Sequence, residues 1–276
     1  MNALIGDIGN TNTKICLIEL KTFKIKKIIY FNSNIISSKN LNLKKSFNFV
    51  SKNILSSSFL KKQFKKIIKK EKINKFALIS SVVPKYNYFL KSFLKKFYKL
   101  ELKEIKDKKI KKIIKINIKN KNQIGSDRIA NAVGVFKKYK SNCIVLDFGT
   151  ATTFDVVTKN GIYNGGIIAP GINLSIKSLI KSADQIPKFK LKKHKKIIGK
   201  NTLEALRSGF YWGYIGLINN IIFKIEKETG QKYKIIFTGG YADLFKNSIK
   251  KPFKIDKNIT IKGIVEIFKE NKKYLI

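Results

Sequence analysis

Cysteine, arginine and histidine are scarce in this chain, which has two cysteines, two arginines and one histidine in 276 residues. Cys16 and Cys143 lie inside apolar runs, and neither belongs to a CxxC pair or has a histidine nearby. Neither a disulfide nor a zinc site is therefore indicated. The pattern is typical of two buried thiols in a reducing compartment.

Long apolar runs are also missing. No stretch approaches the roughly 18 unbroken apolar residues of a membrane helix. The first residues, MNALIGDIGN, lack the cationic region followed by an apolar stretch that marks a secretion signal. We therefore expect a cytoplasmic protein without a membrane partner. An apolar content of 43% is enough to build a globular core.

Acidic residues are few, 17 against 59 basic ones, and the formal net charge is +42. Such a charge ordinarily points to nucleic acid or an anionic surface. Here nearly all of it is lysine spread along the chain, whereas proteins that read DNA grooves rely on arginine. Lys, Asn, Ile, Phe and Tyr are the residues that an AT-rich coding sequence favours. We attribute the charge to that bias and expect no specific nucleic-acid partner.

Glycine is absent between Gly9 and Gly125. Elsewhere it gathers in short motifs, namely DIGNTNT, IGSDR, FGTATT, YNGGIIAPGI and FTGG. Glycine persists where the backbone must turn tightly or approach a ligand closely. These motifs are therefore the places to look for chemistry.

Hydrophobic periodicity predicts an α/β chain in two related lobes. The first half is predicted to have three strands, then helices and a fourth strand. The second half repeats the order of strand, Gly/Thr turn and strand. We place the boundary near residues 118–124, which lack apolar periodicity, and so predict lobes at 1–122 and 123–276. The predicted strands are 3–9, 13–20, 24–31, 75–82, 143–149, 153–159 and 234–240, and the predicted later helices are 128–139, 172–183, 201–228 and 263–271.

Two turns have the same pattern, an aspartate that ends an apolar strand, then glycine and threonine. They are DIGNTNTK, which begins at Asp7, and DFGTATT, which begins at Asp147. Glycine lets the backbone amides approach a phosphate, hydroxyls and amides donate to it, and the carboxylate can hold Mg²⁺ or its water. One such turn could be an ordinary hairpin. Two copies favour a phosphate clamp.

Other nucleotide-binding patterns are missing, because no GxGxxG follows a strand and no P-loop surrounds the GKNT motif at Gly199. FTGGYADLF, with a strand, two glycines and a helix, has a shape suited to contact with adenine or ribose. It could equally be a plain strand-to-helix turn. YNGGIIAPGI is interpreted as a rigid Gly/Pro turn that serves architecture.

Asp127 and Arg128 are predicted to start a helix. An acidic residue there can simply complement the helix dipole. The functional alternative is a general base beside an anion-binding guanidinium, which attack of a substrate hydroxyl on a terminal phosphate requires. The scarcity of arginine in this chain favours the second interpretation.

The motifs together resemble one family. DIGNTNTK, GSDRIANAV, LDFGTATTFD, GGIIAPGI, GKNTLEALRSG and FTGG, in this order and at these separations, resemble the type III pantothenate kinases. The resemblance spans nearly the whole chain. It implies a duplicated actin-like (ribonuclease H-like) ATPase fold and the ATP-dependent phosphorylation of pantothenate, the first step of coenzyme A biosynthesis.

The resemblance also implies roles for residues. ATP and Mg²⁺ would be bound by the first turn, with Asp7 holding the metal indirectly, and Thr150 would contact the nucleotide. Asp147 would hold a monovalent cation, K⁺ or NH₄⁺, and Asp127 would take the hydroxyl proton. The family acts as a homodimer, in which Thr202 would reach the substrate across the interface. The residues implied for ATP are Asp7, Ile8, Gly9, Asn10, Thr11, Asn12, Thr13, Lys14 and Thr150, and those for pantothenate are Gly125, Ser126, Asp127, Arg128 and Thr202.

One departure from the family pattern is Ile118, which stands where the family usually has a tyrosine. A hydroxyl contact to pantothenate is then missing or comes from elsewhere. Two alternatives remain open at this point. One is a kinase of the same superfamily with another small hydroxyl substrate, and the other is a basic nucleic-acid-binding or regulatory protein on a degenerate kinase fold.

Overall fold

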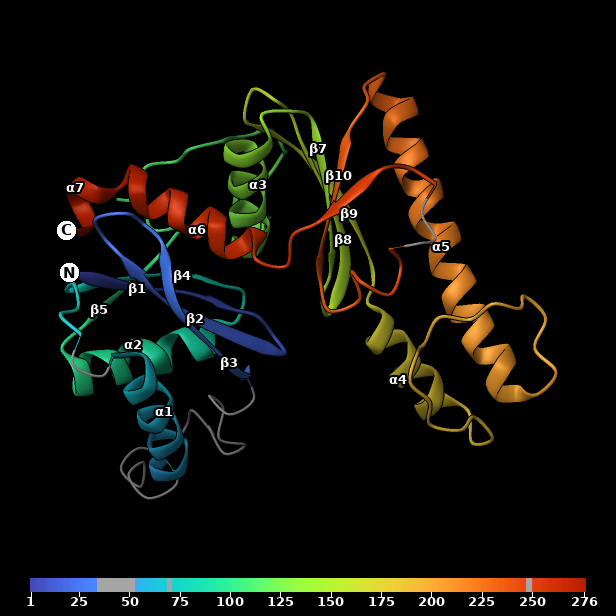
Figure 1. Cartoon of the computed structure of the whole chain (residues 1–276), viewed down its shortest axis with the longest axis horizontal. Helices are drawn as coiled ribbons and strands as arrows, with labels where there is room; N and C mark the ends of the chain where they lie inside the picture. Colours follow the sequence, from blue (N-terminus) through green and yellow to red (C-terminus); the bar gives the residue numbers. More distant parts are fainter. Residues whose placement is uncertain (34–52, 69–70, 247–249) are drawn as a thin grey trace. The chain divides into compact units, whose positions relative to one another are not determined.

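The computed structural model describes residues 1–33, 53–68, 71–246 and 250–276 (Figure 1). These residues form two compact units. The first comprises 1–113, 120–137 and 260–276, and the second comprises 114–119 and 138–259. Each unit has its own sheet and its own apolar core. Among the described residues, no helix combines the length and apolar content needed to cross a bilayer.

The first unit is built on a five-stranded sheet of order β3-β2-β1-β4-β5. The first three strands are antiparallel neighbours, and β4 and β5 continue the sheet in parallel with β1. The elements are β1 (Asn2–Ile8), β2 (Asn12–Glu19), β3 (Ile25–Asn32), α1 (Asn53–Ile68), β4 (Phe76–Ser81), α2 (Pro84–Tyr98), β5 (Glu101–Glu104), the 3₁₀ turn η2 (Lys121–Gln123), α3 (Ser126–Tyr139), α6 (Ile259–Glu270) and α7 (Lys272–Leu275).

Helices cover both faces of this sheet, which explains why its central strands β1, β2 and β4 are mostly buried. Figure 1 shows α1 and α2 on one side and α6 with α7 on the other. Leu60 and Phe64 of α1 and Leu90 of α2 are fully buried against the sheet. On the other side, Phe268 of α6 packs against Phe23, with ring centroids 6.4 Å apart. The last helices therefore complete the core of the first unit.

The second unit has a six-stranded sheet of order β11-β10-β7-β8-β9-β6. Its strand β7 pairs antiparallel with β8, which pairs antiparallel with β9, while β10 and β11 run parallel to β7. The elements are β6 (Lys115–Ile116), β7 (Cys143–Phe148), β8 (Ala151–Val157), β9 (Ile162–Pro170), α4 (Ile172–Ser182), α5 (Thr202–Thr229), β10 (Lys234–Gly239) and β11 (Phe253–Ile255).

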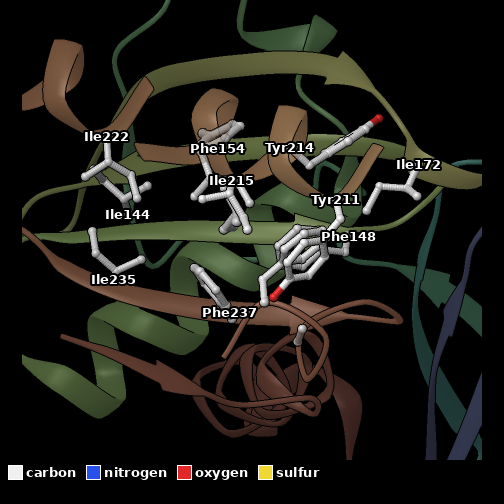
Figure 2. Packing of buried hydrophobic residues seen from close by; sticks show 14 of the residues in the cluster. Ile144, Phe148, Phe154, Ile172, Tyr211, Tyr214, Ile215, Ile222, Ile235 and Phe237 are labelled. Atoms are coloured by element: carbon white, nitrogen blue, oxygen red, sulfur yellow. The ribbon is translucent and has the colours of Figure 1, made fainter. Parts of the chain in front are cut away.

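The core of the second unit lies between this sheet and helices α4 and α5 (Figure 2). Ile215 and Ile222 of α5 lie over Ile144 of β7 and Ile235 of β10. Phe148, the last residue of β7, packs edge-on against Phe237, with ring centroids 5.4 Å apart. This aromatic contact anchors the end of the strand from which the second Gly/Thr turn begins.

The predicted α/β class with two related lobes is confirmed, because strands β9-β8-β7-β10-β11 repeat the order and pairing of β3-β2-β1-β4-β5. The division by contacts is discontinuous in sequence. Residues 120–137 and 260–276 group with the first unit, whereas the sequence boundary had put everything after 122 in the second lobe. The physical reason is packing: the Thr260 hydroxyl donates to Asn131 Oδ1 at 2.7 Å, and Gly263 allows α6 to approach the backbone of Ala130.

Two local predictions are wrong. YNGGIIAPGI is not a turn but most of strand β9, which tolerates Gly165 at a φ of +100° next to a register shift against β8. Residues 240–246, expected to begin a helix after FTGG, form turns. The short strands β5, β6 and β11 were not predicted, since they have only two to four residues and little apolar content.

Candidate active site

The first turn, residues 7–14, joins β1 to β2 through Gly9, Asn10 and Thr11. The Gly9 amide donates to the carbonyl of Asn12 at 3.0 Å, which closes the hairpin. Ile8 is fully buried in the core of the first unit and holds the turn to the sheet. Asn10 and Thr11 are exposed. The turn is thus held to the sheet, and it presents a glycine, an amide side chain and a hydroxyl to solvent.

Thr13 and Ser33 stabilise the first turn through side-chain hydrogen bonds. The Thr13 hydroxyl lies 2.9 Å from Ser33 Oγ, and Ser33 Oγ donates to the carbonyl of Gly9 at 2.7 Å. Thr13 is completely buried. Thr13 therefore stabilises the shape of the turn, although the family resemblance had placed it among the residues that bind ATP.

Asp7 lies in the last part of β1, in register with Lys14 of β2 and with Ser80 of β4. It is partly exposed, and the Ser80 side chain beside it is fully buried. A carboxylate at this place lies at the carboxyl end of β1 and β4, where ligands of open α/β sheets are bound.

The second turn, residues 147–153, is one residue shorter, because only Gly149 and Thr150 separate β7 from β8. The Gly149 amide donates to the carbonyl of Ala151 at 3.0 Å. Phe148 is buried, as Ile8 is in the first turn, while Thr150 is exposed. The predicted repeat of the two hairpins is confirmed in its backbone, and the difference in length is new.

Two glycines allow other segments to pack closely against the second turn. Gly239, at the end of β10, has a φ of +84°, and a Cβ there would lie 2.6 Å from both Asp147 Oδ1 and the Phe148 carbonyl oxygen. Gly171, just before α4, would place a Cβ 2.0 Å from the Thr150 carbonyl oxygen. The glycines of FTGG and APGI thus serve close packing against the second turn.

Asp127 and Arg128 are in the first turn of α3, as predicted, and both are partly exposed. The Arg128 amide donates to Asp127 Oδ1 at 2.8 Å. A Cβ on Gly125 would lie 2.4 Å from that same oxygen, so glycine is needed directly beneath the carboxylate. Burial raises the pKa of the Asp127 carboxyl above its usual value, while the Arg128 amide and guanidinium oppose the shift.

The first turn and the start of α3 meet at the end of β4. The Val82 amide donates to the carbonyl of Ile8 at 3.2 Å, and Ser126 Oγ lies 2.6 Å from the carbonyl oxygen of Ser81. A Cβ on Gly125 would be 3.5 Å from Val82. One edge of the first unit therefore brings together Asp7, the glycine-containing turn and the partly buried carboxyl of Asp127.

Thr202 begins α5 in the second unit and is exposed. Its neighbour Asn201 caps the helix, accepting from the Glu204 amide at 2.9 Å, and Glu204 in turn accepts from the Lys200 amide at 2.9 Å. This is close to a capping box. A side chain at position 199 would collide with the backbone of Ala205, so Gly199 permits this close approach. The GKNT motif thus fixes the start of α5 and leaves the Thr202 side chain open.

Ile118 also lies in the second unit, whereas Gly125 to Arg128 lie in the first. Its Cγ2 atom would be 3.5 Å from a Cβ on Gly165 in β9. Ile118 is therefore packed beside β9 without strain. Its apolar side chain offers no hydrogen bond in place of the tyrosine hydroxyl.

Oxygen atoms at the two turns suit the cations implied by the family. Mg²⁺ is usually held in proteins by one or two carboxylates together with waters and substrate phosphates, and Asp7 supplies one such carboxylate. At the second turn, Asp147 Oδ1 and the Phe148 carbonyl oxygen both face Gly239, so closely that a Cβ there would lie 2.6 Å from each. Within the described ranges, no group of three or more His, Cys, Asp or Glu side chains gathers as a metal cage.

Sequence reasoning missed Ser81 and Glu104, which both contact Ser126. Glu104 ends β5, a strand of four residues that periodicity did not reveal. Its one available signal was its position: a carboxylate in a chain with only 17 acidic residues, placed shortly before the GSDR motif.

Comparison with known proteins identifies relatives of this chain. A family model described as type III pantothenate kinase matches residues 3–224. A type III pantothenate kinase from Pelagibacter ubique is 48% identical over 262 residues, which covers 95% of this chain and 96% of the relative.

Two solved structures resemble the fold. A Campylobacter jejuni protein assigned to the Baf family of transcriptional activators superposes with a TM-score of 0.57 at 22% identity, over 98% of this chain and 99% of that one. An activator of 2-hydroxyisocaproyl-CoA dehydratase from Clostridium difficile, with bound ADPNP, gives a TM-score of 0.53 at 11% identity, over 99% and 96%. These likenesses agree with the duplicated actin-like fold.

Proposed function

Because the chain belongs to the type III pantothenate kinase family, we propose that its two turns and the start of α3 divide the work of phosphoryl transfer among them. The reaction is the ATP-dependent phosphorylation of pantothenate to 4'-phosphopantothenate, the first step of coenzyme A biosynthesis. The observation that carries the proposal is the edge of the first unit where Val82 and Ser81 link the first turn to Ser126.

The first turn binds the phosphates of ATP. Its exposed Asn10, Thr11 and Asn12 offer donors, and Gly9 lets the backbone come close to phosphate oxygens. Asp7 would hold Mg²⁺ indirectly, and such an ion would supply charge neutralisation at the phosphate oxygens. Lys14, in register with Asp7, adds a positive charge beside them.

Asp127 is the general base. Its carboxyl lies at the start of α3 and is partly buried, and burial raises its pKa, so that it accepts a proton more readily than an exposed aspartate. It takes the proton of the pantothenate hydroxyl as the oxygen attacks the γ-phosphate. Gly125, Ser126 and Arg128 are the residues that we assign to the pantothenate site around it, and Thr202 of a second copy of the chain would reach the substrate across the homodimer interface. Positioning and charge neutralisation supply the acceleration.

The second turn has a different task. Thr150 contacts the nucleotide from an exposed position beside the start of α4. Asp147 would hold K⁺ or NH₄⁺, and the Phe148 carbonyl oxygen, which faces Gly239 together with Asp147 Oδ1, could supply a second oxygen. The first turn would thus hold the divalent ion and the second the monovalent one.

A cytoplasmic homodimer is the form we propose for the enzyme. Both cysteines are free and buried, which is typical of a reducing compartment. The second unit exposes large apolar side chains on three elements, Ile168 of β9, Leu174 of α4 and Phe223 of α5. Exposed apolar side chains of this size favour a subunit interface. Light scattering after gel filtration would give the mass of the dimer, twice 31.6 kDa, or contradict it.

A coupled ADP-release assay tests the function. With Mg²⁺ and K⁺, we expect turnover with pantothenate and none above background with acetate or sugars. Omission of K⁺ should lower the rate. Equal or greater turnover with another small hydroxyl substrate would transfer the proposal to that substrate. Sequence-selective DNA binding that persists near physiological salt would favour a nucleic-acid role instead, because binding by surface lysines alone collapses as salt rises.

A further inference from the structure

The carboxyl of Glu104 contacts Ser126, the first residue of α3. Its Oε1 atom is 2.9 Å from Ser126 Oγ, and the same hydroxyl is 2.6 Å from the carbonyl oxygen of Ser81. Ser126 is buried, with 2% of its surface exposed, and Asp127 is the next residue. The three groups come from the ends of β4 and β5 and the beginning of α3.

We propose that Glu104 is a positioning residue for phosphoryl transfer: through Ser126 it fixes the first turn of α3 and with it the carboxylate of Asp127. The inference rests on the proposed role of Asp127 as the base. Glu104 itself need not touch either substrate.

Counting protons indicates how the contact is made. A serine hydroxyl carries one proton and can donate one full hydrogen bond. Ser126 Oγ donates both to the Ser81 carbonyl and to Glu104 Oε1. Its single proton is therefore shared between two acceptors, which together hold the start of α3. Burial raises the pKa of the Glu104 carboxyl, and nearby Asp107 adds to the shift, while Ser126 and Lys106 oppose it.

A second tether comes from the residues after β5. Lys106 Nζ donates to the carbonyls of Asn122 and Ile124, both at 3.0 Å. The Ile124 carbonyl immediately precedes Gly125, and the Asn122 carbonyl lies two residues earlier. Glu104 and Lys106 therefore hold the chain on both sides of Gly125, the residue that must lack a side chain beneath Asp127.

The geometry predicts which substitutions are tolerated. Glu104→Gln keeps an acceptor oxygen on a side chain of nearly the same shape within reach of Ser126 Oγ. Glu104→Leu removes the acceptor and leaves Ser126 Oγ with Ser81 as its contact. Because a displacement of about 1 Å can cost a reaction about 100-fold, even a small shift of Asp127 should be visible in kcat.

Glu101 provides the matched control. It begins the same strand, but it is 40% exposed and pairs with Lys75 and Lys103 at the surface. Glu101→Leu removes the same group from β5 without touching Ser126. Thermal unfolding and ATP binding of each variant report whether the fold is intact.

The test is steady-state kinetics with pantothenate and ATP on the full chain. We expect kcat of Glu104→Gln within about twofold of the original protein and kcat of Glu104→Leu at least about tenfold lower, with KM for ATP unchanged within about twofold. The inference is overturned if Glu104→Leu matches Glu101→Leu in kcat, or if Glu104→Gln is as impaired as Glu104→Leu.

A double-mutant cycle with Ser126→Ala covers the case in which Glu104→Leu is too unstable to assay. If Glu104 acts through Ser126, Glu104→Ala in the Ser126→Ala background should match Ser126→Ala alone, and independent, multiplicative losses would contradict the link. Asp127→Asn, assayed alongside, distinguishes a failure of the proposed base Asp127 from a failure of the proposed role of Glu104. Full turnover of Asp127→Asn refutes the base, whereas an inactive Asp127→Asn with a fully active Glu104→Leu refutes only the role of Glu104.

Discussion

Five strands of each sheet share the same order and the same pairing, yet the turns that the two sheets present differ. The first turn has three residues between its strands and the second has two. The neighbouring strand differs as well. Ser81 lies in register with Ile8 in the first unit, and Gly239 lies in register with Phe148 in the second.

The difference between Ser81 and Gly239 at this register position matches the different tasks that we propose for the two turns. The Ser81 carbonyl accepts the Ser126 hydroxyl and ties the start of α3 to the first turn. Gly239 instead packs closely against the Asp147 carboxylate and the Phe148 carbonyl, where no side chain would fit. In the mechanism we propose, the duplicated scaffold thus positions the general base in one copy and two oxygen atoms for a cation in the other.

The largest effect is expected for Asp127→Asn. An asparagine fits the same space but cannot accept the hydroxyl proton, and general bases contribute about 10²- to 10⁴-fold. We expect kcat to fall by that factor while ATP still binds, as measured by ADP release and by calorimetry. Asp243→Asn, at an exposed carboxylate paired with Lys257, is the control and should retain its rate.

Asp127→Asn, although it lowers kcat, should make the folded protein more stable. Because burial raises the pKa of Asp127 in the folded protein, ionisation of this group costs more in the fold than in the unfolded chain. The cost is absent below the ordinary pKa of an aspartate and complete above the raised pKa. Asp127→Asn should therefore raise Tm at pH 7 and lose this advantage as the pH falls. An equal gain in Tm at all pH values would contradict the shift.

Gly239→Ala should disturb the second turn but not the first. The positive φ and the 2.6 Å approach to Asp147 predict a loss of about 1–3 kcal/mol in the free energy of unfolding. The activation by K⁺ should weaken with it. Gly240→Ala is the matched control, since its nearest neighbour would be 3.9 Å away, and its stability should stay within about 0.5 kcal/mol. Urea unfolding of both variants makes the comparison.

The smallest effects concern the start of α5. Asn201→Ala removes the helix cap and should cost about 1 kcal/mol of stability. Thr202→Ala should leave the stability unchanged within about 0.5 kcal/mol and raise KM for pantothenate. If both substitutions change only the stability, Thr202 has no part in the substrate site.

Much of the fold follows from local patterns. The apolar strands around Asp7 and Asp147 and the periodic helices gave the two lobes, because each element has to bury one or both faces. Strand β9 was hidden by Gly165 and Gly166, which are typical of turns, and its conformation depends on pairing with β8. The return of α6 to the first unit depends on contacts more than a hundred residues apart in the sequence, which no local pattern reveals.

The candidate site was predictable to a similar degree. Asp127 and Gly125 were identified by their motif, and the structure gives the physical reason for the glycine, the closeness of the carboxylate. Glu104 was not identified, because its contact with Ser126 is created by the order of strands β4 and β5 in the sheet. Motifs reveal groups that are adjacent in sequence, and the groups that hold them in place come from the topology.

The central claim, that the first turn serves the divalent ion and the second the monovalent ion, is tested most directly by cation titrations of Asp7→Asn and Asp147→Asn. Initial rates of ADP release are measured against Mg²⁺ and against K⁺. For Asp7→Asn we expect a half-saturating Mg²⁺ concentration at least about tenfold higher, with K⁺ activation retained. For Asp147→Asn we expect K⁺ activation to disappear, with the Mg²⁺ requirement within about twofold of the original. The same change in both variants, or the reverse assignment, would contradict the account.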